Sequence, residues 1–132
     1  MKGYKANIEK LVSGNSSFRQ VLYTAKHTQL VVMTLKPLEE IGMEVHNEND
    51  QFFRFEEGSG KAIIDGNEYE ISSGDVVIVP SGAEHNIINT SETQDLKLYT
   101  LYSPPHHMDG IVHKTKEEAE ADSESFDGKT TE

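Results

Sequence analysis

The chain has 132 residues and no cysteine, and its 12 basic and 23 acidic residues give a formal net charge of -11. This length suits one compact domain, and the lack of cysteine excludes disulfide scaffolds, zinc fingers and cysteine nucleophiles. The acidic balance disfavours nucleic acids and anionic membranes as partners, because binding of phosphate groups depends on Lys and Arg.

The N-terminal segment, residues 1–17, contains residues 7–12, which can form one or two helical turns. It lacks the apolar stretch of a secretory signal. The uninterrupted aliphatic runs of the chain reach only four residues, as in Leu30–Met33, which is too short to span a membrane. We therefore expect a cytoplasmic protein.

Short strands separated by turns are expected from residue 18 to residue 102. The expected strands are residues 18–24, 30–35, 41–46, 52–55, 61–64, 68–71, 76–79, 86–89 and 96–102. Asp65-Gly66 is a hairpin signal, because glycine tolerates a positive φ. Turn signals recur roughly every 8–12 residues, a spacing typical of sandwiches and barrels. The sequence therefore predicts an all-β domain over residues 18–115.

The segment after the last expected strand holds three histidines, His106, His107 and His113. If this loop folds over the barrel, His106 or His113 can supply a proton-transfer group; the alternative is a set of surface histidines. Residues 116–132 carry seven acids and one large apolar residue, which favours a short acidic tail, solvated or partly helical.

Two segments contain the polar residues that are candidates for a functional site. In the first, Glu44 and His46 are two residues apart, so a strand would place them on one face, and Gln51 follows a short turn. The second contains His85 between two turn signals and Asn89. Polar side chains that converge inside a small barrel are costly unless they bind something or one another.

The second segment resembles a motif of the cupin family: Gly, five residues, Pro, one residue, Gly, two residues, His, three residues, Asn. The matching residues are Gly74, Pro80, Gly82, His85 and Asn89. The other family motif, His-x-His, three or four residues, Glu, six residues, Gly, is matched in spacing by Glu44, His46, Gln51 and Gly58, with two of three ligand identities changed. The resemblance covers residues 18–102. It implies a double-stranded β-helix, which is a jelly-roll barrel of two sheets, and a homodimer.

In that family the motif side chains hold a divalent metal, so the resemblance implies Glu44, His46, Gln51 and His85 as metal ligands. Two imidazoles and one carboxylate suit iron or manganese with open coordination positions, and the same set suits zinc; nickel stays open as well. Gln51 is a neutral donor that can be a fourth ligand or bond to a metal-bound water. The alternative is a metal-free site in which Glu44 hydrogen-bonds to a histidine.

The family resemblance also frames the function. Phosphomannose isomerases hold zinc with one Gln, two His and one Glu, so the chain is similar to small cupins labelled mannose-6-phosphate isomerase-like. We expect a metal-binding protein that binds or converts a small polar metabolite, a sugar or a hydroxy-acid. Arg19 and Arg54 are its only arginines, a poor complement for a phosphate. The alternatives are a non-haem iron or manganese dioxygenase, and a metal-free barrel that binds a ligand or serves as a structural module without catalysis.

Overall fold

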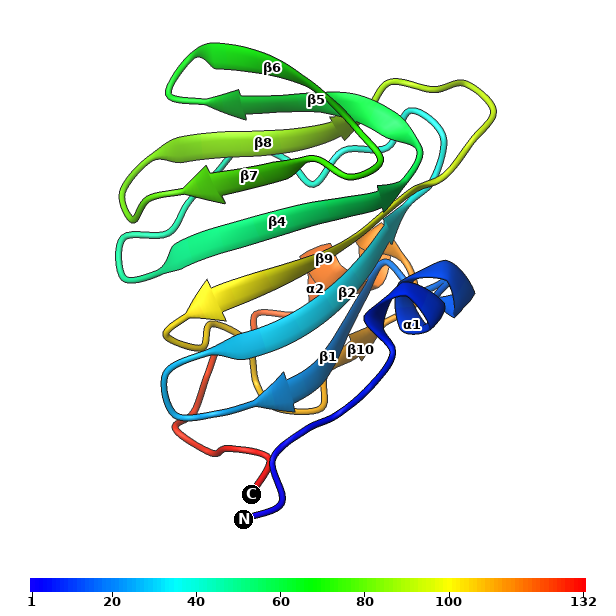
Figure 1. Cartoon of the computed structure of the whole chain (residues 1–132). Coiled ribbons are helices and arrows are strands. Elements are labelled where there is room, and N and C mark those ends of the chain that lie inside the picture. The colour runs from blue at the N-terminus through cyan, green and yellow to red at the C-terminus, as the bar shows by residue number, and fades with distance from the viewer.

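The computed structural model describes residues 1–132 and consists of two antiparallel sheets packed face to face, with a small helix near each end of the chain (Figure 1). The six-stranded sheet has the order β10-β1-β2-β9-β4-β7, and the four-stranded sheet has the order β3-β8-β5-β6. The elements are α1 (Ile8–Gly14), β1 (Arg19–Thr24), β2 (Gln29–Leu35), β3 (Glu44–Val45), β4 (Asp50–Glu57), β5 (Ser59–Ile64), β6 (Asn67–Ser72), β7 (Val76–Val79), β8 (Glu84–Asn89), β9 (Leu96–Ser103), β10 (Val112–His113) and α2 (Lys116–Ala121). This architecture confirms the predicted all-β jelly roll.

The observed strands follow the predicted ones closely, with two differences. The expected strand over residues 41–46 is reduced to Glu44–Val45, preceded by an isolated bridge from Glu40 to Ile88. Gly42 lies between them with a φ of +106°, which breaks the extended backbone. The short strand β10 pairs with β1 and was not expected, because two residues carry no periodic signal.

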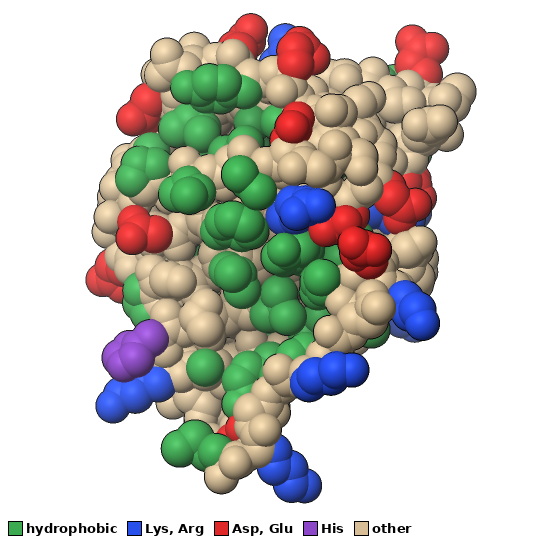
Figure 2. Space-filling model, in the orientation of Figure 1, with side chains coloured by type: hydrophobic (Ala, Val, Ile, Leu, Met, Phe, Trp, Pro, Cys, Tyr) green, Lys and Arg blue, Asp and Glu red, His purple; other side chains and the backbone are tan.

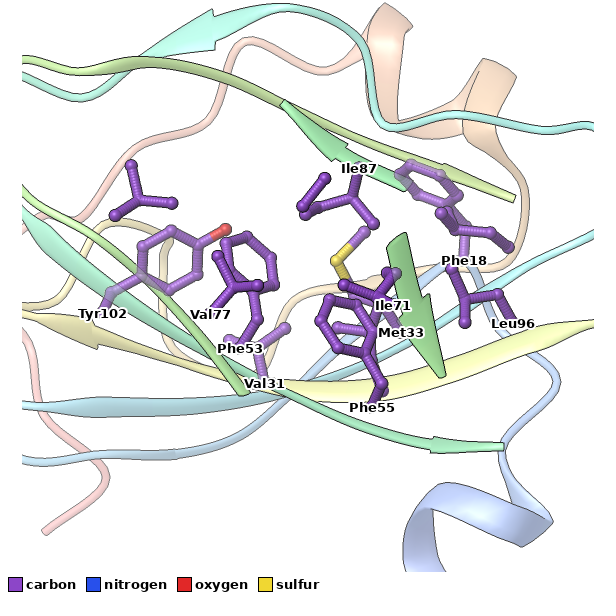
Figure 3. Close-up of a cluster of buried hydrophobic side chains, with 14 of the residues drawn as sticks. Phe18, Val31, Met33, Phe53, Phe55, Ile71, Val77, Ile87, Leu96 and Tyr102 are labelled. Atoms are coloured by element: carbon purple, nitrogen blue, oxygen red, sulfur yellow. The ribbon is translucent and has the colours of Figure 1, made fainter. Parts of the chain in front are cut away.

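The hydrophobic core lies between the two sheets and runs along the barrel (Figure 3). Tyr102 lies at one end of this cluster, whereas Phe18 and Leu96 lie at the other. The strand register explains this order. Tyr102 on β9 stands opposite Gln29 on β2, while Leu96, six residues earlier, stands opposite Leu35. One end of the barrel interior is therefore lined by polar and aromatic side chains, and the other by aliphatic and phenyl groups.

At the apolar end, the neighbouring strand β8 lies so close to Gly60 that there is no room for a side chain. A Cβ added there would lie 2.2 Å from the carbonyl oxygen of Ile88 and 3.2 Å from the Leu96 side chain. Gly60 and Ile88 belong to the four-stranded sheet, and Leu96 belongs to the six-stranded sheet. The absence of a Cβ at Gly60 thus allows β5 to pair closely with β8 and to pack against Leu96 of the opposite sheet.

The C-terminal residues are mostly exposed, as expected of an acidic tail, but hydrogen bonds tie them to the barrel. The first part is helical, as predicted, with Thr115 as the N-cap of α2. The remainder lies against the barrel. The Phe126 amide donates to the His106 carbonyl, and the Thr131 amide donates to the Thr24 carbonyl. Neither helix has the length or the apolar character that a membrane crossing requires.

Candidate metal centre

Glu44, His46 and His85 meet at the polar end of the barrel. Strands β3 and β8 are paired so that Glu44 stands opposite His85. His46 lies two residues beyond Glu44, on the same side of the extended backbone. One ligand atom from each of the three side chains lies within 4.8 Å of the other two. The predicted convergence of one carboxylate and two imidazoles is therefore present in the fold.

A direct hydrogen bond links two members of this group. The His46 Nε2 lies 3.1 Å from a Glu44 carboxylate oxygen, and the His46 side chain is only 10% exposed. Burial alone raises the pKa of Glu44, but the hydrogen bond and the charge of His46 outweigh it and leave the pKa below its ordinary value. Glu44 is thus a carboxylate at neutral pH and can act as an anionic ligand.

His85 presents one unused nitrogen. Its Nδ1 donates to the Ala83 carbonyl at 3.1 Å, which leaves the lone pair on Nε2. That Nε2 is buried and has no hydrogen-bond partner. Burial lowers the pKa of His85, so the ring stays neutral. A backbone bond that fixes the opposite nitrogen is the usual support for an imidazole ligand. The donor set therefore fits a divalent metal.

Gln51 lies on β4, in the opposite sheet, and is buried. Its Nε2 donates to the Thr100 hydroxyl at 3.0 Å, while its Oε1 has no partner. It stands opposite Tyr102 in the strand register, and the Tyr102 ring meets the His46 ring edge-on at 5.8 Å. Gln51 thus presents an unpaired carbonyl oxygen beside the residues that flank the metal candidates.

The two proton-transfer candidates occupy different places. The His106 ring lies 4.3 Å from the His46 ring and 5.2 Å from that of Tyr102. Burial, with the nearby His107 and His46, lowers the pKa of His106 to about 4. His113 instead lies on β10, where its Nε2 is 3.0 Å from Asp122 and its Nδ1 is 3.5 Å from Arg19. Only His106 therefore borders the candidate metal centre.

Two buried side chains, His107 and Glu124, support Tyr102 through hydrogen bonds and were missed from the sequence. The Nδ1 of His107 is 2.5 Å from the Glu124 carboxylate, and its Nε2 is 3.2 Å from the Tyr102 hydroxyl. Glu124 also accepts the Met108 amide at 2.8 Å. Glu124 is one of seven acids in residues 116–132, and nothing in its local sequence distinguishes it from the others. Only the return of the C-terminal segment to the barrel reveals its partner.

Burial shifts the pKa values of His107 and Tyr102, two of these hydrogen-bonded groups. It lowers the pKa of His107, although the hydrogen bond that His107 donates to Glu124 acts in the opposite direction. Burial also raises the pKa of Tyr102. We therefore read this hydrogen-bonded group as a His107 ring that donates to the Glu124 carboxylate and accepts from the neutral Tyr102 hydroxyl.

A surface hollow lies apart from these groups. It measures about 480 Å³ and has no hydrophobic wall. Its lining residues are Glu56, Glu57, Gly58, Ser73, Gln94, Asp95 and Lys97. None of them belongs to the candidate centre, so the interior of the barrel and not this hollow carries the convergent chemistry.

Comparisons with known proteins agree with this architecture. The cupin domain family model matches residues 31–102. Protein YrkC of Bacillus subtilis is 39% identical over 126 residues, covering 91% of this chain and 67% of that protein. Protein L612 of Acanthamoeba polyphaga mimivirus is 41% identical over 112 residues, covering 83% and 70%. The solved structure of BH2720 from Bacillus halodurans superposes with a TM-score of 0.89 at 36% identity, covering 92% of this chain and 96% of that one.

Proposed function

Because the chain belongs to the cupin domain family, we propose that it binds a divalent metal through Glu44, His46 and His85 and holds a small polar metabolite beside it. Gln51 is the proposed fourth donor, either to the metal or to a water on it. The metabolite belongs to the sugar or hydroxy-acid class.

The state of His85 carries this proposal. A buried imidazole nitrogen without a partner is destabilising, so the position calls for a ligand that completes it. The ring is neutral and its Nδ1 is fixed by Ala83, which is the state that metal coordination needs. Glu44 contributes the negative charge that favours a cation.

The surrounding residues prepare the site for a polar ligand. A bound divalent metal supplies a Lewis acid that polarises a ligand oxygen. His106 is neutral at pH 7 and borders His46, so its ring can accept a hydrogen bond or a proton from the ligand. The Tyr102 hydroxyl is hydrogen-bonded to His107, which holds the Tyr102 ring in place beside the site.

The metal content of the purified protein tests the proposal. We expect about one divalent ion per chain by elemental mass spectrometry, and its loss in His85→Gln, because neutral imidazole is the better ligand. His27→Gln is the matched control, since His27 is exposed in the turn between β1 and β2. A wild-type protein that binds none of zinc, iron(II), manganese or nickel, or a His85→Gln variant that binds metal as tightly as wild type, would contradict the assignment.

A dioxygenase is the second candidate, favoured by the ligand types themselves. Two histidines and one carboxylate in one cluster are the set used by non-haem iron oxygenases. Oxygen consumption by the iron-loaded protein, measured with a catechol, thiol and diketone panel, distinguishes this activity from isomerisation. Oxygen uptake that requires both iron and Glu44 would favour the dioxygenase, whereas its absence with every compound would favour the first function.

We further propose that the outer face of the six-stranded sheet pairs with a second copy of the chain. Figure 2 shows apolar side chains gathered over this face, and Val76 and Ile78 are 52% and 63% exposed there. Two chains of net charge -11 repel each other, so a sparsely charged, self-complementary face is the favoured contact. Ile78→Lys should convert a dimer to a monomer in light scattering, whereas Leu38→Lys, at an exposed loop position, should not; a monomeric wild-type protein would contradict the proposal.

A further inference from the structure

The two imidazoles of the candidate metal centre are oriented in different ways. The Nδ1 of His85 bonds to the Ala83 carbonyl, so the backbone fixes that ring. His46 makes its one side-chain hydrogen bond to Glu44, itself a proposed ligand, and its other ring nitrogen has no partner in the protein. A ligating imidazole ordinarily has a partner on its second nitrogen that holds its orientation. The orientation of His46 must therefore come from the side chains that pack against its ring.

One of these side chains belongs to the loop that follows β9. The His106 ring lies 4.3 Å from the His46 ring, and the Tyr102 ring lies 5.8 Å from it. The rings of His106 and Tyr102 are themselves stacked at 5.2 Å. The hydrogen bonds of His106 are made by its backbone amide and carbonyl, and its ring makes none. The contact with His46 therefore depends on how the His106 backbone is held.

Gln29 holds that backbone. It is the first residue of β2, is fully buried, and stands opposite Tyr102 in the strand register, so its side chain points into the polar end of the barrel. Its Oε1 accepts the amides of His106 and His107 at 3.1 and 2.9 Å. Its Nε2 donates to the His107 carbonyl at 2.8 Å and to the Thr24 hydroxyl at 2.9 Å. Both N–H groups and both lone pairs of the amide are thus used.

Other contacts hold the loop on either side of these two residues. The Asn49 amide donates to the Pro105 carbonyl at 3.4 Å, and the Phe126 backbone amide donates to the His106 carbonyl at 2.9 Å. Gln29 differs from them because it is the one side chain that bonds to the backbone of two successive loop residues. A fully satisfied polar group in the interior holds its partners rigidly.

We propose that Gln29 is a positioning residue of the candidate metal centre, which keeps His46 in its ligating orientation through the His106 ring. The contacts run from the Gln29 amide to the loop backbone, then to the His106 ring and to the His46 ring. Gln29 and His106 both lie outside residues 31–102, so this support is added to the region that the cupin domain model matches. The inference rests on the proposed function for the role of His46 as a ligand, but the ring contact itself requires no metal.

Metal-free wild-type protein tests the structural half of the inference by NMR. We expect the His106 and His107 amides to exchange with solvent at least about 10-fold more slowly than the amide of His27, which lies in an exposed turn. We also expect nuclear Overhauser contacts between the ring protons of His46 and His106. Exchange as fast as that of His27, or no contact between the two rings, would overturn the inference.

Substitution of Gln29 tests the functional half. Gln29→Met keeps the volume but removes the amide, so the contact between His46 and His106 should be lost. The zinc dissociation constant should rise about 10- to 100-fold, the range for loss of a residue that supports a metal ligand. Gln29→Glu retains an oxygen for the two loop amides and should restore part of the affinity. Thr24→Val is the matched control, because it removes another bond of the same amide without touching the loop, and its zinc affinity should stay near that of wild type.

Substitution of His106 separates packing from coordination. His106→Ala should weaken zinc binding as Gln29→Met does, whereas His106→Phe keeps a ring against His46 without a nitrogen and should bind zinc like wild type. An equal loss in both variants would mean that a nitrogen of His106 acts on the metal, which would overturn the inference. Circular dichroism identifies variants that fail to fold, and this half-buried loop position decides the question if Gln29→Met does not fold.

The two proposals fail separately. If wild type binds no metal, the proposed function falls, while loss of the ring contact in metal-free Gln29→Met still supports the role of Gln29 in positioning His46. If wild type binds metal and folded Gln29→Met keeps the same affinity, the metal proposal stands and the role of Gln29 falls.

Discussion

The two ends of the barrel interior are built from the same strands, but they differ in whether their buried atoms have suitable partners. At the apolar end, Phe55 and Leu96 are fully buried in a hydrocarbon environment. At the polar end, His85 Nε2 and Gln51 Oε1 are buried without partners. The difference indicates that packing at one end stabilises strands whose other end carries unsatisfied groups, an arrangement typical of a binding site.

The largest expected effect comes from the apolar end. Phe55→Ala should lower the free energy of unfolding by about 3–5 kcal/mol, because a fully buried ring is replaced by a void. Urea denaturation measures this, with Phe52→Ala on the half-buried outer face as a milder control. If the remaining folded protein binds metal as wild type does, the two ends act separately; a parallel loss of metal affinity would show that they do not.

The second prediction concerns the polar end of the barrel, where His85 is replaced. Metal at 100 times its dissociation constant should raise the unfolding free energy of wild type by about 2.7 kcal/mol, and His85→Gln should abolish most of that gain. Without metal, the variant should lose only about 1 kcal/mol, because the bond from Nδ1 to the Ala83 carbonyl is the one hydrogen bond of the ring and Nε2 makes none. Thermal melts with chelator and with zinc test both expectations. A large loss of stability in chelator would mean that His85 is structural.

Glu124→Gln sharpens the comparison by removing a satisfied charge at the polar end. The Glu124 and His107 side chains are each 6% exposed, so the loss should be about 1.5–3 kcal/mol, the range for a hydrogen bond to a charged group. Glu120→Gln is the control, because the Glu120 side chain is 68% exposed. Chemical denaturation separates the variants, and equal stability of the two would show that the C-terminal segment adds nothing to the barrel.

The smallest expected effect is a dependence on pH in metal-free protein. Burial lowers the pKa of His107 below 6.5 and that of His106 to about 4, so the folded state binds fewer protons than the unfolded state just below pH 6.5. Stability therefore rises with pH across that interval and is complete above it. Glu44 and Glu124, with lowered pKa values, contribute stability above pH 4.5 that is lost only as the pH falls further.

One imidazole accounts for less than about 1 kcal/mol between pH 7 and pH 6. His107→Gln should therefore flatten the pH dependence of the unfolding free energy over this range, relative to both wild type and His27→Gln. Denaturant titrations at several pH values provide the measurement. An unchanged dependence in the His107 variant would mean that this ring is not held neutral by burial.

The sequence predicts the barrel well because its signals are local. Gly74, Pro80 and Gly82 mark turns, and the period-2 strands between turns leave few alternatives to a jelly roll. The meeting of Glu44 with His46 follows from a spacing of two. Their meeting with His85 follows from the family resemblance, and the ligand role of all three remains a prediction.

The parts that the sequence does not reveal depend on distant contacts. Glu124 and His107 are 17 residues apart, and Arg19 and His113 are 94 residues apart. The acidic composition of residues 116–132 predicts solvation, but the hydrogen bonds that return the segment to the barrel come from single residues without a pattern. The burial of Arg19 also runs against expectation, because arginine on a strand usually faces solvent.

Gly60, at the apolar end, also affects the position of His85 at the polar end. It pairs with Asn89 on β8, and four residues later on the same two strands Ile64 pairs with His85. A methyl group at position 60 would push β5 away from the Ile88 carbonyl and Leu96. Strands in a hydrogen-bonded ladder shift together, so the displacement would reach the imidazole about 13 Å away. The missing side chain thus helps to set the position of His85 from a distance, and Gly60→Ala should change the distances among Glu44, His46 and His85 without touching any of them.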